Sequence, residues 1–353
     1  MSKKKYLALI LCLLMLVSLF TGCGQSNTSA SDTNGTEDSS TKADTTADTS
    51  KSNYEIAVVV KITGIQFFNV MEDGVKKAGQ ELGVNAYVVG PTEADAAEQV
   101  KIIEDLITEK VDAIIVDPND ATALEAVLQR ARDAGILVIS TESPGQVGAD
   151  YDVELINNYN FAVANAESLA KAMGGKGQYA IYVGGLSTPL HNAWADVVQD
   201  YLSKNYPDMK LATDRIACGE DAALARTTTL NLLTTYPDLK GVIAFGSQGP
   251  LGAAEAIKES NLVGQFAIVG NVVPSEASEY LKDGSITQGY LWNPADTGYA
   301  CVYTAYQLLN GGSVTDGKFE VPGVGAPDAS QEGILAYDDT LVITAENADS
   351  LGF

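Results

Sequence analysis

Histidine is nearly absent from this chain of 353 residues, which contains a single one, His191. One histidine excludes paired-histidine metal motifs such as H-E-x-x-H. The sequence also lacks a G-x-x-x-x-G-K-[ST] phosphate-binding loop. The segment Phe245-Gly246-Ser247-Gln248-Gly249 misses the G-x-S-x-G nucleophile motif, because position 245 is not glycine. We therefore expect neither catalysis nor a metal or other cofactor.

Basic residues and cysteines are also few. Lys and Arg number 22 against 46 Asp and Glu, which gives a formal net charge of −24. A body of this charge does not attract nucleic acid or anionic lipid, so the acidity favours solubility alone. Apart from Cys12 and Cys23 near the N-terminus, the chain has only Cys218 and Cys301. Two cysteines make no disulfide framework, so they are either buried thiols or one optional bridge.

The N-terminus has the pattern of a secretory signal. Basic Lys3–Lys5 precede the apolar run Tyr6–Phe20, which is shorter than the roughly 18 residues of a membrane span. The sequence Leu19-Phe20-Thr21-Gly22-Cys23 resembles the bacterial lipoprotein box, with Phe20 in place of the usual aliphatic residue. That resemblance implies a signal peptide over residues 1–22 and lipidation of Cys23, which would anchor the protein outside the cytoplasm on a bacterial membrane. An unmodified Cys23 in a disulfide is the alternative.

Two segments of different composition follow the signal pattern. Residues 23–53 are rich in Ser, Thr, Asp and Ala without apolar periodicity, which predicts a disordered tether. From Tyr54 the composition is globular, and 300 residues are enough for two domains or one large two-lobed body.

Short apolar runs alternate with helical patterns along this globular part. We expect strands at residues 56–60, 86–89, 113–116, 136–139, 179–183, 211–216, 242–245, 267–269, 286–291 and 341–343. We expect helices at 68–82, 122–134, 192–205, 222–235, 251–260, 275–283 and 297–309, and one more opened by a Thr92–Asp95 capping box. Repeated strand–helix–strand units predict an α/β fold of two doubly wound parallel-sheet lobes joined by a multi-crossover hinge. Lobe 1 would comprise 54–157 plus 293–330, and lobe 2 would comprise 158–292 plus 331–353.

Candidate ligand-binding residues follow the predicted strands, because open parallel sheets bind ligands beyond the carboxyl ends of their strands. They are Lys61, Phe67, Phe68, Asp117, Glu142, His191, Asn192, Ser247, Gln248, Asn271, Trp292 and Asn293. Carboxylates, amides and lysine satisfy hydroxyl groups, and aromatic rings pack on the C–H faces of a sugar, so a polyhydroxylated ligand is indicated. At some positions a structural role is the alternative: Asp117 could cap a helix, one of the two Phe residues could be core, and His191 could be structural.

Four segments carry a family resemblance: Phe67-Phe68, Asp117–Asp120, Gly246–Ala253 and Leu291–Tyr299. They resemble the type I periplasmic binding proteins, in the ribose-, rhamnose- and autoinducer-2-binding branch, over Tyr54 to Phe353. The resemblance implies a two-lobed, three-crossover fold that closes around a sugar-like molecule and delivers it to the permease of an ABC transporter. It implies a monomer that binds no nucleic acid.

The ligand itself stays open between alternatives. Lys61 and Glu142 stand where autoinducer-2-binding proteins have ligand residues, whereas Leu190-His191 replaces their Asp-Gln pair, and Phe245 and Ser247 replace their Pro and Ala. A pentose, deoxyhexose, furanose or polyol is therefore the alternative to the autoinducer. A ligand-sensing role is the alternative to transport.

Overall fold

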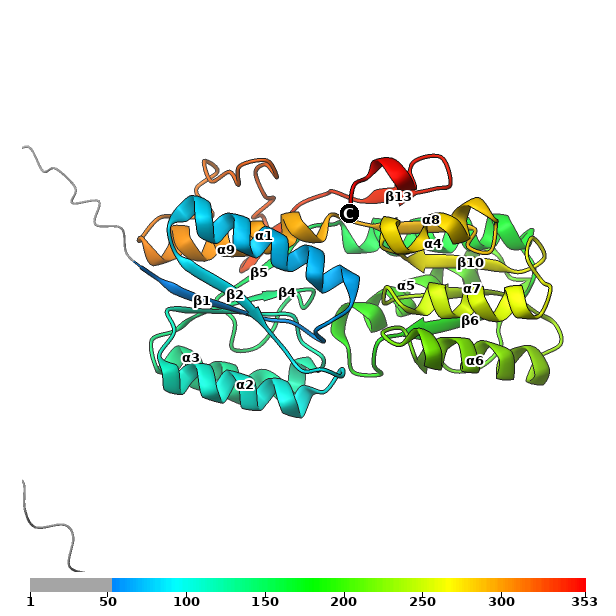
Figure 1. The fold of residues 1–353 in the computed structure, drawn as a ribbon, viewed down its shortest axis with the longest axis horizontal. Helices are drawn as coiled ribbons and strands as arrows, with labels where there is room; N and C mark the ends of the chain where they lie inside the picture. The colour runs from blue at the N-terminus through cyan, green and yellow to red at the C-terminus, as the bar shows by residue number, and fades with distance from the viewer. Residues whose placement is uncertain (1–52) are drawn as a thin grey trace, which may run out of the picture. The chain divides into compact units, whose positions relative to one another are not determined.

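The computed structural model describes residues 53–353, and Figure 1 shows their arrangement. The predicted signal peptide, the predicted lipidation site Cys23 and the predicted tether up to residue 52 lie outside the described residues. The predicted α/β class with two parallel-dominated sheets is confirmed.

The first sheet is wholly parallel, with the strand order β12-β5-β4-β3-β1-β2. Its strands are β1 Glu55–Val59, β2 Asn85–Val89, β3 Ala113–Val116, β4 Leu137–Thr141, β5 Tyr151–Glu154 and β12 Ile334–Ala336. Central strands such as β3 are apolar and buried throughout, as strands covered on both faces must be. Helices α1 Gln66–Leu82 and α9 Pro294–Leu309 lie on one face, and α2 Ala96–Glu109 and α3 Ala121–Asp133 lie on the other (Figure 1).

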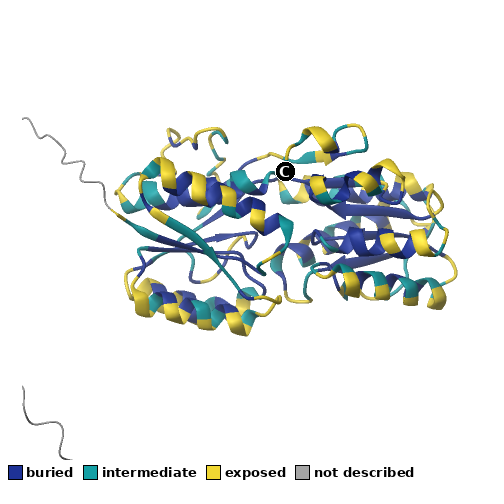
Figure 2. Ribbon diagram, in the orientation of Figure 1, coloured by how far each residue is buried: buried dark blue, intermediate teal, exposed yellow. Residues whose placement is uncertain are grey.

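The second sheet has the order β13-β11-β10-β9-β6-β7, with β8 also paired to β6 and β13 antiparallel. Its strands are β6 Gly177–Val183, β7 Met209–Leu211, β8 Ile216–Ala217, β9 Leu239–Ala244, β10 Ala267–Asn271, β11 Gln288–Leu291 and β13 Leu341–Ile343. Around it pack α4 Asn158–Met173, α5 Pro189–Asn205, α6 Ala222–Thr235, α7 Gly249–Glu259, α8 Pro274–Lys282 and the short 3₁₀ helix η1 Ala348–Ser350. Figure 2 shows the central strands of both sheets as buried and the outward faces of the helices as exposed.

The chain passes between the sheets three times: from β5 to α4, from β11 to α9, and from β12 to β13. The third passage corrects the expected lobe boundary at residue 331. Ile334–Ala336 pairs in parallel with Asp152–Glu154 of β5, so this segment belongs to the first sheet and the chain crosses only after it.

Three local expectations are also corrected. Helix α2 begins at Ala96, because the Asp95 side chain, rather than a Thr92 capping box, accepts the N–H groups of Ala97 and Glu98. The strand expected at 211–216 is two short strands, β7 and β8. Strands β5 and β12 were not predicted, because runs of four and three residues carry little periodicity.

Both cysteines of the described part, Cys218 and Cys301, are buried free thiols. Within residues 53–353, no helix has the length and apolar character needed to cross a bilayer.

Candidate functional site

A narrow cavity of about 20 Å³ lies where strands of both sheets end at their carboxyl termini. The residues around it follow β1, β4, β6, β8, β9, β10 and β11, which is the edge at which open parallel sheets bind ligands. They are Lys61, Phe67, Phe68, Glu142, His191, Glu220, Gly246, Ser247, Asn271, Leu291 and Trp292.

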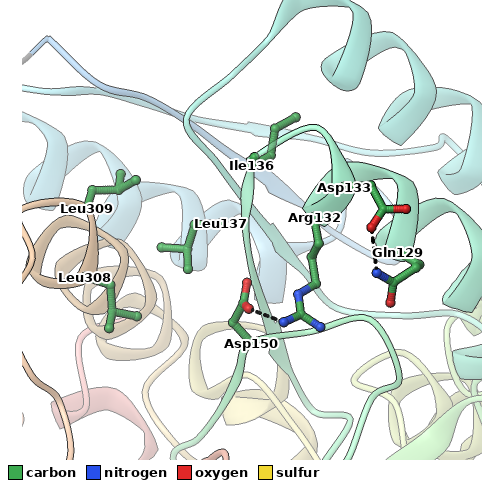
Figure 3. A pocket seen from close by; sticks show the side chains of 9 residues that line it. Gln129, Arg132, Asp133, Ile136, Leu137, Asp150, Leu308 and Leu309 are labelled. Atoms are coloured by element: carbon green, nitrogen blue, oxygen red, sulfur yellow. Dashed lines mark hydrogen bonds and ion pairs between the residues drawn. The ribbon is translucent and has the colours of Figure 1, made fainter.

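A wider hollow of about 560 Å³ lies at the opposite end of β4, where α3 and α9 end (Figure 3). Its polar side chains pair with one another: Arg132 Nη2 lies 2.8 Å from Asp150 Oδ1, and Gln129 donates to Asp133 Oδ1 at 3.0 Å. Since these groups are already satisfied and the hollow is open, we assign the functional site to the smaller cavity.

Lys61 organises the polar wall that the first sheet contributes. Its Nζ lies 2.5 Å from Glu142 Oε2 and 3.3 Å from Asp117 Oδ2, and all three side chains are buried. Burial raises the pKa of Asp117 well above its ordinary value, an effect that the Glu142 charge adds to and the Lys61 charge opposes. The two carboxylates together raise the pKa of Lys61, outweighing the burial that would lower it. Lys61 is therefore a fixed cation.

Glu142 is positioned to accept a hydrogen bond from a molecule in the cavity. Its backbone has a φ of +54°, an uncommon conformation for a residue with a side chain, and such strain concentrates at binding sites. Its Oε1 is buried and accepts no hydrogen bond within the described residues. Asn271 Oδ1, on the opposite side, is likewise buried and unpartnered among residues 53–353. An unpaired buried acceptor costs about 1–3 kcal/mol, so these oxygens await a donor.

Aromatic rings form the apolar wall. The ring of Phe67 meets those of Phe68 and Trp292 edge to face, at centroid distances of 5.1 and 5.7 Å. Trp292 Nε1 donates to Thr297 Oγ1 at 3.0 Å, which fixes the plane of the indole. The resulting surface is apolar and rigid, as the C–H face of a sugar ring requires.

His191 faces the cavity from the start of α5. Its Nδ1 accepts the Gly184 N–H at 2.9 Å, and its ring stacks on Trp194 with centroids 5.6 Å apart. Burial, together with the Lys61 charge, holds the pKa of His191 well below its ordinary value. The imidazole is therefore neutral.

Metal binding finds no support in this arrangement. Across residues 53–353, no three His, Cys, Asp or Glu side chains are placed to hold a metal ion.

Comparison with known proteins identifies the family. Residues 56–313 match the family model described as the periplasmic binding protein domain. The chain belongs to the periplasmic binding protein family.

Among curated relatives of this periplasmic binding protein, a D-apiose import binding protein of Actinobacillus succinogenes is 28% identical over 240 residues, which cover 67% of this chain and 74% of that protein. A D-ribose/D-allose-binding protein of Pseudomonas aeruginosa is 27% identical over 285 residues, or 76% of this chain and 86% of that protein.

Two solved structures share its fold. LsrB from Clostridium saccharobutylicum in complex with AI-2 has a TM-score of 0.78 at 22% identity, covering 84% of this chain and 99% of that one. An ABC transporter solute-binding protein from Clostridium phytofermentas with bound L-rhamnose has a TM-score of 0.77 at 24% identity, covering 84% and 97%.

Most predicted site residues of this periplasmic binding protein lie together in the cavity wall: Lys61, Phe67, Phe68, Glu142, His191, Ser247, Asn271 and Trp292. Asp117 lies behind them and contacts Lys61 rather than the cavity. The helix cap considered for it is provided instead by Asp120, which accepts the Ala123 N–H.

Three predicted residues lie outside the cavity wall, and their amide groups bond to the local backbone or to a neighbouring acid. Asn192 donates to the carbonyl oxygens of Gly185 and Thr188. Asn293 caps α9 and donates to Asp296, and Gln248 donates to Glu276 at 3.2 Å. None of the three lines the cavity.

Glu220 is a charged residue of the cavity wall that was not predicted from the sequence. It comes three residues after β8, which was not recognised as a separate strand. A correct reading of that strand end would have placed Glu220 beside the other candidates.

Proposed function

We propose that this periplasmic binding protein captures a sugar or sugar-like polyhydroxy molecule and delivers it to the permease of an ABC importer. The observation that carries the proposal is the cavity wall, which combines buried unpartnered acceptors, a fixed ammonium and aromatic rings. Hydroxyl groups both donate and accept, so a polyhydroxy ligand matches this wall better than an apolar one. Relatives named for ribose, allose and apiose support the same class.

The space inside the cavity is about 20 Å³, room for roughly one water molecule. The two lobes must therefore open to admit a ligand, and a single small ring requires a smaller displacement than a larger ligand. A pentose, a deoxyhexose or a comparable polyol is the first choice. Autoinducer-2 is the second, because Lys61 and Glu142 face the cavity together and the LsrB structure shares the fold.

Ligand binding would favour the closed arrangement of the two lobes. The ligand would contact Lys61 and Glu142 from the first sheet together with His191 and Asn271 from the second, so it binds best when both sets are close. We place this event outside the cytoplasm, in a monomer, and assign no catalytic step to the cavity.

Thermal unfolding of residues 24–353 tests the proposal, with D-ribose, D-allose, D-apiose, D-arabinose, L-rhamnose and autoinducer-2 as probes. A ligand present at 100 times its Kd adds about 2.7 kcal/mol to the free energy of unfolding, which raises the melting temperature measurably. Stabilisation by at least one probe is the expected result. No stabilisation by any probe would contradict the proposal.

We further propose that Cys23 carries the lipid anchor. Two acyl chains hold a protein on a membrane stably, whereas one holds it only marginally. Cys23→Ser should therefore move the protein from the membrane fraction to the soluble fraction and abolish incorporation of labelled fatty acid. An unchanged distribution would show that Cys23 is not the anchor.

A further inference from the structure

One donor and one acceptor in the cavity wall lie side by side and do not bond to each other. His191 Nε2 is 3.9 Å from Glu220 Oε1, which is too long for a hydrogen bond. Both side chains are nine-tenths buried, with exposed fractions of 2% and 8%. Both residues line the cavity, so a third group there can form a hydrogen bond with each of them.

The direction of each hydrogen bond can be assigned. Since His191 Nδ1 accepts the Gly184 N–H, the proton of the neutral ring is on Nε2, which is therefore a donor. Burial raises the pKa of Glu220, an effect that the Lys61 charge opposes, and in its carboxylate form Glu220 can only accept.

Gly184 keeps this pair in place. A Cβ at this position would lie 3.0 Å from both Glu220 Cγ and His191 Nδ1. A side chain larger than hydrogen would therefore push the two groups away from the cavity.

We propose that His191 and Glu220 together recognise one hydroxyl group of the ligand, which accepts from Nε2–H and donates to the Glu220 carboxylate. A hydroxyl oxygen at about 2.7–3.0 Å from each atom fits between atoms 3.9 Å apart. An ammonium group has no lone pair for Nε2–H, and a deoxy position offers nothing to either residue. The pair thus selects a hydroxyl over an amine or a hydrogen at that ring position.

This inference rests on the proposed sugar-binding function and deepens it. The chain offers a direct probe, because His191 is its only histidine and its imidazole signals need no assignment by mutagenesis. Protein labelled with ¹⁵N is titrated with D-ribose, D-allose, D-arabinose or L-rhamnose. The sugar that stabilises the protein should shift the Nε2 resonance as the ligand hydroxyl binds to it.

Variants then separate recognition from folding. Glu220→Gln removes the charge that strengthens the hydrogen bond and should weaken binding of that sugar at least about 10-fold. Glu276→Gln is the matched control: this partly buried acid bonds Gln248 outside the cavity wall, and its replacement should change affinity less than about 2-fold. One monodeoxy analogue of the sugar should bind the unaltered protein at least about 100-fold more weakly than the sugar itself does. For the Glu220→Ala variant, the difference in affinity between the same two ligands should be much smaller.

The outcomes distinguish a failure of hydroxyl recognition by His191 and Glu220 from a failure of the proposed sugar binding. If a sugar binds but the Nε2 resonance stays fixed and Glu220→Gln behaves like Glu276→Gln, the inference is wrong and the sugar-binding function stands. If no sugar in either experiment binds, both fail. Melting curves of each variant without sugar show whether lost binding reflects lost folding.

Discussion

At the scale of single residues, Lys61 neutralises two buried carboxylates, those of Asp117 and Glu142. Lys61→Met would leave both without a cation, and breaking a buried ion pair from one side costs about 3–5 kcal/mol. We expect a loss of that order in the free energy of unfolding from urea titration at pH 7. The loss should be smaller at pH 5, because burial raises the pKa of Asp117 in the folded state, which favours its neutral form as the pH falls.

Lys258→Met is the control for this change. Its partner Asp283 is at the surface, with exposed fractions of 44% and 38% for the two side chains, so water screens the pair. Equal losses in the two variants would mean that the buried cluster does not depend on Lys61.

A second residue-scale effect concerns Asp152 and Glu154, which lie two residues apart on β5 and are both buried. Burial raises the pKa of Asp152 to about 6 and, with the charge of Asp152, raises that of Glu154 well above its ordinary value. The folded protein thus keeps protons that the unfolded chain releases near pH 4. The contribution of Asp152 to stability is complete below about pH 4 and is lost as the pH rises through about 6. The contribution of Glu154 changes in the same direction.

The Asp152→Asn, Glu154→Gln double variant should remove this dependence. We expect the free energy of unfolding of the unaltered protein to fall between pH 4.5 and 7 more steeply than that of the variant, by on the order of 2 kcal/mol. Urea titrations at each pH measure both. Parallel pH profiles would assign the slope to other carboxyl groups.

At the scale of elements, α1 and α9 approach so closely that their contact requires glycine. A Cβ on Gly74 would lie 1.8 Å from the Ala295 carbonyl oxygen, and one on Gly298 would lie 2.3 Å from that of Met71. Helix propensity alone would make Gly74→Ala stabilising by about 1 kcal/mol. We expect the opposite sign, a loss of about 1–3 kcal/mol in urea unfolding, because the helices must separate. Asp73→Ala, at the exposed neighbouring position, should cause no such loss.

The elements also show what the sequence could and could not predict. Most long strand–helix units were predicted, because apolar strands such as β3 are followed by helix-capping residues such as Asp120. The 16-residue helix α4 was not predicted. Short strands such as β5, β8 and β12 were missed or merged, since their pairing depends on distant segments. The cavity followed from strand ends, so most of its wall was predicted and Glu220 was lost together with β8. The side chains of Asn192, Asn293 and Gln248 bond to local partners instead. Strand order could not predict this, because it depends on side-chain geometry.

At the scale of the whole described body, the two sheets are linked by three chain passages and by contacts between their loops. Ser187 Oγ and Thr188 Oγ1, in the loop before α5, both donate to the Asn119 carbonyl oxygen after β3, at 3.5 and 3.4 Å. Asn119 is itself fixed, because its side chain donates to the Lys61 carbonyl oxygen and its N–H to buried Gln99. A rigid acceptor on one sheet thus receives two hydroxyls from the other, next to the cavity.

These hydroxyls should stabilise the ligand-binding arrangement although neither lines the cavity. The Ser187→Ala, Thr188→Val double variant keeps the side-chain volumes nearly unchanged, so we expect sugar affinity to fall about 2–10-fold through a smaller population of the competent arrangement. Calorimetric titration measures the affinity, and small-angle scattering of the ligand-free protein should report a larger radius of gyration. Thr227→Val, whose hydroxyl bonds only within α6, should change neither quantity. Unchanged affinity and radius in the double variant would mean that the ligand alone holds the two sheets together.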